Sequence, residues 1–173
     1  MIRNRLVFLI LSIILAVLSI IIYAQHSQNI SPTFQLDAVV RLDRVVDGDT
    51  VWVASVYGFK KDQRFRVRLA DIDSHERGQQ GYEEAKQELN RILQSASCIV
   101  LDVDSPPYDR YGRVVAIVYV LDSPNILLNV NSRLVKGGFA QYVDFSGSFH
   151  PEDFKYFVEI PADLRSILAR HCP

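Results

Sequence analysis

The sequence is poor in cysteine and has almost no excess of charge of either sign. Its two cysteines, Cys98 and Cys172, do not have the spacing of metal ligands, so we interpret each as a buried thiol or half of one disulfide. A disulfide between them is expected only in an exported domain. The chain has 19 basic and 20 acidic residues, and its net charge of -1 does not indicate a protein that binds nucleic acid. Any phosphate recognition must therefore come from locally placed Arg and Lys.

The sequence also lacks internal repeats and low-complexity stretches. The chain has 173 residues, of which 49% are hydrophobic and 23% are charged, a composition typical of a globular domain rather than a disordered segment. Part of the apolar share lies in the first 24 residues and cannot belong to a soluble core. The length and this distribution predict one folded domain with an attachment.

One long hydrophobic run extends from Leu6 to Ala24 and contains no charged residue. A helix of this length rises roughly 28 Å, close to the hydrocarbon thickness of a bilayer. Arg3 and Arg5 precede the run, and the positive-inside rule then places the N-terminus in the cytoplasm. We predict a single-pass membrane anchor at 6–24, with a cytoplasmic segment at 1–5 and a short polar tether at 25–33.

A cleaved signal peptide is the alternative interpretation of this segment. The apolar region of a signal peptide is normally only about 7–15 residues long, followed by a cleavage site with small residues. Ile22-Tyr23-Ala24 is a poor site of this kind, so an uncleaved anchor is favoured. Both interpretations place the remaining domain outside the cytoplasm, anchored in the first case and secreted in the second.

The rest of the chain alternates strand patterns with three helical patterns. The expected elements are two strands around an Asp-Gly turn within 34–57, a strand at 64–69, an amphipathic helix from 82 to about 95, strands at 98–103 and 114–120, a loop at 105–112, a short helix at 126–136, an extended piece at 139–143 and a last helix at 161–170. Five strands with a helix after the third predict an α+β fold, a five-stranded Greek-key barrel of the OB type with packed helices.

Four short segments are candidates for a functional site: Asp47–Thr50 (DGDT), Arg68–Glu76 (RLADIDSHE), Gly78–Ala85 (GQQGYEEA) and Asp109–Arg113 (DRYGR). Each has an ordinary structural explanation when it is taken alone. An Asp-Gly pair favours a tight hairpin turn, and alternating arginines favour a solvated strand face. The combination, in this order and on these elements, is much harder to explain by chance.

The residue types in these segments suit the hydrolysis of a phosphodiester. Two guanidinium groups, here Arg68 and Arg113, can bind phosphate oxygens in a bidentate manner. A hard cation held by carboxylates such as Asp49 and Asp73 polarises the same phosphate. A further carboxylate, Glu76, can position or deprotonate the attacking water. The set is complete for metal-assisted phosphodiester hydrolysis.

The same segments resemble the motifs of the staphylococcal nuclease (thermonuclease) family. The family's DGDT turn is unchanged at Asp47–Thr50, and Arg68–Glu76 is similar to its R-L-x-x-[IV]-D-[AT]-P-E segment. Glu84-Ala85 matches the E-A pair before its first helix, and Asp109–Arg113 matches its D-x-Y-G-R. The resemblance covers roughly Val39 to Tyr142.

The resemblance implies a calcium-dependent nuclease that cuts DNA, RNA or both and leaves 3′-phosphorylated products. Asp49 and Asp73 would bind Ca2+ through their carboxylates, and Ser74 would bind it through its main-chain carbonyl. Arg68 would bind the scissile phosphate in the ground and transition states. Glu76 would be the general base, or would orient the water.

The resemblance also implies that Arg113 stabilises the pentacoordinate phosphorus and the leaving group, and that Arg110 and Tyr111 hold a terminal phosphate. Three features depart from the family pattern. His75 replaces the usual Pro before the base, where a Pro would stiffen the loop. Tyr142 and Phe145 lie near the positions of the family's substrate-binding tyrosines, but Asp144 stands between them, and Tyr142 is the substrate-binding residue that we predict. The C-terminal tail does not resemble the usual C-terminal helix.

These observations predict a nuclease domain at 34–145 and a divergent tail at 146–173 that packs on it. The expected partners are a nucleic-acid substrate and the membrane, with no protein partner and a monomeric state. A catalytically inactive barrel that binds nucleic acid or protein is the alternative, and a structural envelope protein is a third hypothesis. Degenerate copies usually lose the arginines or the base, and Arg68, Glu76 and Arg113 are all retained. Whether these three side chains converge on one pocket separates the hypotheses.

Overall fold

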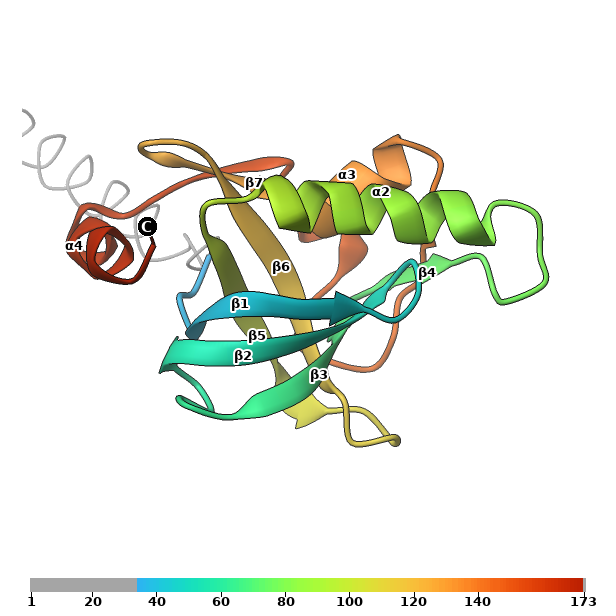
Figure 1. The fold of residues 1–173 in the computed structure, drawn as a ribbon, viewed down its shortest axis with the longest axis horizontal. Helices are drawn as coiled ribbons and strands as arrows, with labels where there is room; N and C mark the ends of the chain where they lie inside the picture. The colour runs from blue at the N-terminus through green and yellow to red at the C-terminus, as the bar shows by residue number, and fades with distance from the viewer. Residues whose placement is uncertain (1–33, 173) are drawn as a thin grey trace, which may run out of the picture. The chain divides into compact units, whose positions relative to one another are not determined.

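Five strands with alternating buried residues form the centre of the computed structural model, which describes residues 34–172. β1 (Ala38–Val45), β2 (Thr50–Gly58) and β3 (Arg64–Leu69) form an antiparallel meander. β5 (Ile99–Tyr108) pairs with β1, and β6 (Val114–Ser123) pairs with β5. A parallel pairing between β3 and β6 closes the sheet into a five-stranded barrel (Figure 1). The predicted α+β fold and its barrel are confirmed.

The helix predicted after the third strand is α2 (Tyr82–Ser95), and its apolar face packs on the barrel core. Its buried residues recur at helical spacing: Tyr82, Ala85, Leu89, Ile92 and Leu93. Three of them, Leu89, Ile92 and Leu93, share one core with barrel side chains that are almost fully buried, among them Val40, Val51, Val53, Val67, Leu101 and Val118. The short strand β4 (Ile72–Ser74) lies between β3 and α2, so the barrel and the helix together fix the RLADIDSHE segment.

Two element predictions were wrong in part. The segment 105–112 was expected to be a loop, but β5 continues through Pro106-Pro107 to Tyr108. The ladder between β5 and β6 is irregular between Val103 and Tyr108, so the two prolines remove no regular ladder hydrogen bond. The expected helix at 126–136 begins as a strand.

This strand, β7 (Ile126–Asn129), pairs with β6, and the helix α3 (Val130–Lys136) follows it directly. The side chain of Asn129 accepts a hydrogen bond from the Ser132 N–H at 3.0 Å, which caps the helix start. The apolar run from 126 to 136 therefore contains both a strand and a helix, and the buried Asn129 marks the change from one to the other.

The tail after the barrel adds strands to two edges. β8 (Ala140–Tyr142) pairs with β4, and β9 (Phe157–Glu159) pairs with β7. A 3-10 turn (Pro151–Asp153) and the helix α4 (Ala162–His171) complete the tail. Buried Ile160 and Leu168 join a second hydrophobic cluster on the outside of the barrel.

A disulfide between Cys98 and Cys172 connects the end of α4 to the start of β5, with Cα atoms 5.0 Å apart. The expected membrane anchor at 6–24 and its flanking segments at 1–5 and 25–33 lie outside the described residues. Within residues 34–172, no helix is long and apolar enough to span a bilayer.

Candidate active site

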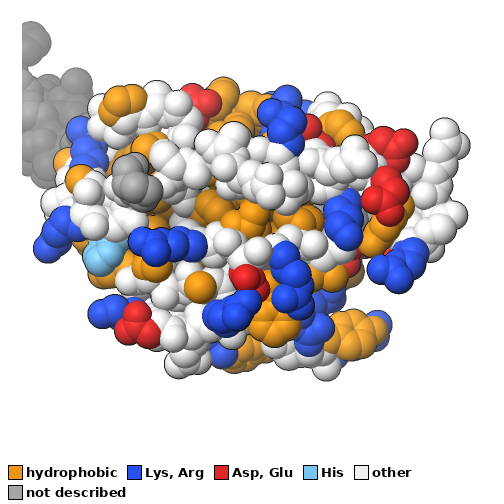
Figure 2. Space-filling view, in the orientation of Figure 1, with side chains coloured by type: hydrophobic (Ala, Val, Ile, Leu, Met, Phe, Trp, Pro, Cys, Tyr) orange, Lys and Arg blue, Asp and Glu red, His pale blue; other side chains and the backbone are white. Residues whose placement is uncertain are grey.

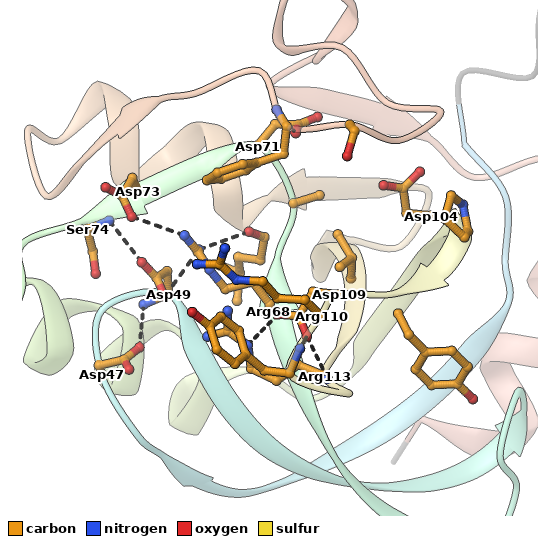
Figure 3. Close-up of a pocket in the computed structure, with 18 of the residues that line it drawn as sticks. Asp47, Asp49, Arg68, Asp71, Asp73, Ser74, Asp104, Asp109, Arg110 and Arg113 are labelled. Carbon is orange, nitrogen blue, oxygen red and sulfur yellow. Dashed lines mark hydrogen bonds and ion pairs between the residues drawn. The ribbon is translucent and has the colours of Figure 1, made fainter.

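A cavity of about 660 Å³ opens where the DGDT turn, the segment after β3 and the loop before β6 meet (Figure 3). Its walls contain most of the residues that the sequence singled out: Asp49, Arg68, Asp73, Ser74, Glu76, Arg110, Tyr111 and Arg113. These residues come from segments up to 64 positions apart. The barrel topology brings them together, because β3 lies between β2 and β6.

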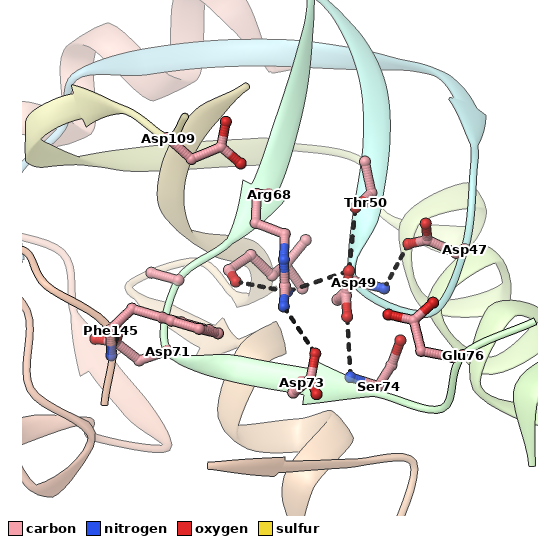
Figure 4. A network of polar contacts seen from close by, with 12 residues as sticks. Asp47, Asp49, Thr50, Arg68, Asp71, Asp73, Ser74, Glu76, Asp109 and Phe145 are labelled. Carbon is pink, nitrogen blue, oxygen red and sulfur yellow. Dashed lines mark hydrogen bonds and ion pairs between the residues drawn. The ribbon is translucent and has the colours of Figure 1, made fainter. Parts of the chain in front are cut away.

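Arg68 is the centre of the polar network in this cavity (Figure 4). Its side chain extends from the C-terminal end of β3 and is almost fully buried, with 8% of the residue exposed. The guanidinium lies 3.1 Å from Asp49 Oδ1 and 3.1 Å from Asp73 Oδ1, and it also donates to the Leu69 carbonyl at 3.2 Å. Two carboxylates therefore hold the guanidinium in one orientation.

Asp49 is fixed in turn by the residues around it. Its Oδ2 accepts a hydrogen bond from the Ser74 N–H at 2.9 Å, and its Oδ1 accepts one from the Thr50 hydroxyl at 3.1 Å. Asp47 Oδ1 accepts from the Asp49 N–H at 3.2 Å, which stabilises the DGDT turn. Burial, with the charge of Asp49 beside it, raises the pKa of the Asp47 carboxyl above its ordinary value.

Gly48 has a packing reason to be glycine. A Cβ atom at this position would lie 2.7 Å from Ser74 and 2.8 Å from the Ala85 side chain. The turn, β4 and the first turn of α2 therefore approach so closely that only Gly and a small residue at 85 fit. This contact accounts for the Gly in the DGDT turn and for the small side chain of Ala85.

Arg113 is held by the DRYGR loop itself. Asp109 Oδ2 accepts from Arg113 Nε at 2.6 Å, and Asp109 Oδ1 accepts from the main-chain N–H groups of Tyr111 and Arg113, each at 2.9 Å. Gly112 supplies the left-handed conformation that this turn requires, with φ of 71°. Although burial opposes it, these hydrogen bonds hold the pKa of Asp109 below its ordinary value.

The second guanidinium of the site reaches the first through Thr50. Arg113 Nη1 donates to the Thr50 hydroxyl at 3.2 Å, and the same hydroxyl donates to Asp49. Tyr111 is exposed, and its ring lies under both Arg110 and Arg113, whose Cζ atoms are 4.7 Å and 5.4 Å from the ring centroid. Both arginines and the tyrosine therefore form one wall of the cavity.

Glu76 projects from the loop between β4 and α2 toward Asp49 (Figure 4). Its main-chain N–H donates to Gln79 Oε1 at 2.8 Å, and its carbonyl accepts from the Gln79 N–H at 2.9 Å. Among the described residues its carboxylate has no hydrogen-bond partner. His75 packs on Gly81, where a Cβ would lie 2.5 Å from the imidazole ring. The loop that carries Glu76 is thus held by contacts with the start of α2 in place of the stiffening Pro.

Two cavity residues were not assigned a role from the sequence. The ring of Phe145 covers Arg68, with the guanidinium Cζ 5.7 Å from its centroid. Asp71 is 3% exposed, and its Oδ1 accepts from the Phe145 N–H at 3.0 Å. Burial raises the pKa of Asp71 to about 6, and the negative charges of Asp104 and Asp144 add to this effect. Both residues connect the tail to the site, a long-range contact with no local signal.

Tyr142, the predicted substrate-binding tyrosine, lies outside the cavity. Its hydroxyl donates to Ser132 Oγ at 3.1 Å, and its ring packs edge-on against Phe154 at 6.0 Å. The residue is on β8, and pairing with β4 directs it away from the cavity wall that Phe145 occupies. Among the described residues, the aromatic ring that lies over Arg68 is that of Phe145.

The donor set at the Asp49–Asp73 side of the cavity fits a hard cation. Asp49 and Asp73 supply carboxylate oxygens, which are ligands that calcium prefers, and the Ser74 carbonyl is the third ligand that the family resemblance implies. Asp49 and Asp73 converge on the same guanidinium, and the main chain of Ser74 lies against Asp49. Within residues 34–172, no three His, Cys, Asp or Glu side chains group as metal ligands, and the proposed set contains only two carboxylates.

The comparisons with known proteins agree with this geometry. Residues 66–160, more than half of the chain, match the family described as staphylococcal nuclease homologue. With the OB-type barrel and the converging motif residues, this match shows the class: the chain belongs to the staphylococcal nuclease homologues.

Among individual relatives, the chain is similar to a micrococcal nuclease of Shigella flexneri, with 37% identity over 101 residues that cover 56% of this chain and 53% of the relative. It is similar to a thermonuclease of Staphylococcus intermedius, with 28% identity over 158 residues, 86% of this chain and 85% of the relative. An endonuclease YncB of Bacillus subtilis is 34% identical over 108 residues, 59% of this chain and 46% of the relative. The chain thus spans about half the length of several curated relatives it matches.

Proposed function

We propose that this protein is a calcium-dependent nuclease that hydrolyses phosphodiester bonds of DNA, RNA or both. The observation that carries the proposal is the convergence of Arg68, Arg113 and Glu76 on one cavity beside Asp49 and Asp73. A catalytically inactive barrel or a structural envelope protein gives no reason for these five side chains to meet. The relatives named as nucleases support the same conclusion.

The two arginines are proposed to bind the scissile phosphate from two sides. Arg68 is oriented by Asp49 and Asp73, and Arg113 by Asp109, so neither guanidinium has to be ordered when the substrate arrives. Because both lie in a partly buried cavity, their interaction with the negative charge that develops on the phosphoryl oxygens is stronger than in water. This preorganisation favours the pentacoordinate transition state over the ground state.

Glu76 is proposed to accept a proton from the attacking water. Its carboxylate is free of protein partners among the described residues and faces the Asp49 side of the cavity. As the water oxygen bonds to phosphorus, one of its protons passes to Glu76 and the bond between phosphorus and the 5′ oxygen breaks. The departing 5′ oxygen takes up a proton from solvent. The products are a 3′-phosphate and a 5′-hydroxyl, with Arg113 beside the leaving oxygen.

Asp49, Asp73 and the Ser74 carbonyl are proposed to hold Ca2+. When bound, the ion polarises the phosphate and the water at the same place. Arg110 and Tyr111 are proposed to bind a terminal phosphate of the substrate, since they form the exposed wall next to Arg113.

The location is proposed to be outside the cytoplasm, on a single-pass anchor at 6–24. The Cys98–Cys172 disulfide supports an oxidising compartment. Extracytoplasmic calcium is often millimolar, and sites of roughly 10⁻⁴–10⁻³ M affinity suit such modules.

The proposal is tested by incubating the full-length chain with single-stranded DNA and with RNA, in calcium and in EGTA. We expect cleavage in calcium that EGTA abolishes, with 3′-phosphate ends. An Arg68→Lys variant should lose about 10²- to 10³-fold in activity, because the ammonium lacks the bidentate geometry. Absence of cleavage by the folded wild-type chain across calcium concentrations and pH would overturn the enzyme assignment and favour a binding-only barrel.

A further inference from the structure

A second hollow of about 450 Å³ lies next to the catalytic cavity, and the two share Asp47 and Arg113 in their walls. The second hollow is lined by Arg44 of β1, Trp52 of β2 and Arg66 of β3, and by Lys86 of α2. We name it the Trp52 groove. Figure 2 shows Lys and Arg side chains gathered around a hydrophobic side chain over these strands.

Three of these residues form a row across the strands. Arg44 is the register partner of Trp52 between β1 and β2, and Trp52 is the partner of Arg66 between β2 and β3. The Cζ atoms of Arg44 and Arg66 lie 5.2 Å and 5.9 Å from the centroid of the Trp52 ring. The indole therefore sits between two guanidinium groups on the outer face of the barrel.

The cations of the groove have few acidic partners. Arg44 is 3.8 Å from Asp43, which also pairs with Arg64, and Arg66 forms no ion pair with any described residue. Arg66 Nη2 donates only to the Tyr111 carbonyl at 3.3 Å, a contact that connects the groove to the DRYGR loop. Four Lys or Arg side chains and one Asp line the groove, on a protein whose net charge is -1.

We propose that the Trp52 groove binds the nucleic-acid strand beyond the scissile phosphate. This inference rests on the proposed nuclease function and extends its substrate site. Arg44, Arg66 and Lys86 would contact successive phosphates, and the indole would offer an apolar surface to a base or sugar. A positively charged groove with an aromatic ring is the arrangement that binds single strands without sequence preference.

A purely structural alternative is that the cation–π contacts stabilise an exposed sheet face. This alternative accounts for the row of Arg44, Trp52 and Arg66. It does not explain Lys86, which reaches the same groove from α2, or the continuity with the catalytic cavity at Arg113. The groove therefore predicts that a long substrate gains affinity that a short one cannot.

Trp52 is the single tryptophan of the chain, so its fluorescence reports on this groove alone. The probe is a 12-nucleotide oligo(dT), compared with a dinucleotide, added in calcium to the full-length Glu76→Gln chain. We expect the 12-mer to quench the Trp52 emission and the dinucleotide to leave it unchanged. Binding of the 12-mer, shown by anisotropy of a label on the DNA, without any change in Trp52 emission would overturn the inference.

The salt dependence of 12-mer binding tests the arginines. Each single-strand phosphate contact contributes a slope of about 0.7 in log K against log salt. Arg44→Gln/Arg66→Gln should lower the slope by about 1.4 and weaken binding at 0.1 M salt by roughly 10- to 30-fold. Arg44→Lys/Arg66→Lys should restore most of the slope, because the charges remain.

The matched control is Arg165→Gln/Arg170→Gln on α4, which removes the same charge from a surface outside both hollows. An equal loss of slope in the control and the groove variant would show a general charge effect and overturn the inference. If wild-type protein cleaves DNA and the groove variant binds the 12-mer as tightly as wild type, the groove inference fails alone. If wild-type protein neither binds nor cleaves DNA, the proposed function fails and the groove inference with it.

Discussion

Replacing Asp102 by Asn should remove a large part of the pH dependence of stability. Asp102 lies on β5 with 7% of the residue exposed, and its Oδ2 accepts a hydrogen bond from the Gln35 N–H at 2.9 Å. Burial raises the pKa of Asp102 from 3.8 to about 7, and the nearby charges of Asp37 and Asp104 add to the rise. The carboxyl is therefore protonated in the folded protein at mildly acidic pH.

The sign of the effect follows from proton linkage. Between pH 4 and 7 the folded protein retains a proton on Asp102 that the unfolded chain has lost, so the free energy of unfolding falls as pH rises. A change in pKa from 3.8 to about 7 corresponds to about 4 kcal/mol as an upper value. We expect about 2 kcal/mol or more, since relaxation and water entry reduce the penalty.

The Asn side chain resembles the protonated acid and can still accept from Gln35. The variant should therefore match wild type near pH 4.5 and exceed its free energy of unfolding by about 2 to 4 kcal/mol at pH 8. Urea denaturation of both proteins at half-unit intervals measures this difference, and Asp71 contributes equally to both curves. Parallel stability curves from pH 4.5 to 8 would refute the reasoning.

Three further predictions follow from single contacts. Asp109→Asn should lower kcat by about 10- to 100-fold with little loss of stability, because Arg113 loses the carboxylate that orients it; steady-state kinetics and thermal melting measure both. Cys98→Ser with Cys172→Ser should lower the free energy of unfolding by about 4 kcal/mol, as a crosslink over 74 residues predicts, and dithiothreitol should then have no further effect on urea unfolding. Tyr142→Phe should keep kcat/KM within about twofold, since its hydroxyl bonds Ser132 outside the cavity, and a tenfold loss would contradict this.

The parts of the site that could be predicted from the sequence are those in which local structure and chemistry coincide. DGDT is both a tight turn and a source of a carboxylate, so Asp49 was found from four residues. Arg68 alternates on a strand whose period is easy to read, and its motif neighbours follow within eight positions. The side chain of Asp109 closes the turn from 109 to 113 by accepting hydrogen bonds from the main-chain N–H groups of Tyr111 and Arg113. The geometry of this loop is therefore set by residues that are close in the sequence.

The parts that could not be predicted depend on distant segments. Phe145 covers Arg68 only because the tail returns past Asp71, and no pattern near Phe145 indicates this contact. The sequence does not distinguish β7 from a helix because its three apolar residues fit both periods, and pairing with β6 decides between them. The place of Tyr142 depends on the pairing of β8 with β4, where its hydroxyl donates to Ser132 outside the cavity.

The pairing of Cys98 with Cys172 was likewise open in the sequence. Both residues join the outer hydrophobic cluster, which forms only when α4 packs beside the start of β5. The Trp52 groove depends on strand register too, since Arg44, Trp52 and Arg66 are separated by eight and fourteen positions in the chain. A row of side chains that crosses three strands cannot be recognised in the sequence, because it depends on how the strands pair.

The central claim is that this cavity catalyses calcium-dependent hydrolysis with Glu76 as its base. The most direct measurement is the single-turnover rate of oligonucleotide cleavage at saturating calcium for wild type, Glu76→Gln and the control Glu83→Gln on the exposed face of α2. We predict a wild-type rate that Glu83→Gln retains and Glu76→Gln lowers by about 10²- to 10⁴-fold. Equal rates for wild type and Glu76→Gln, or no cleavage by the folded wild-type chain, would contradict it.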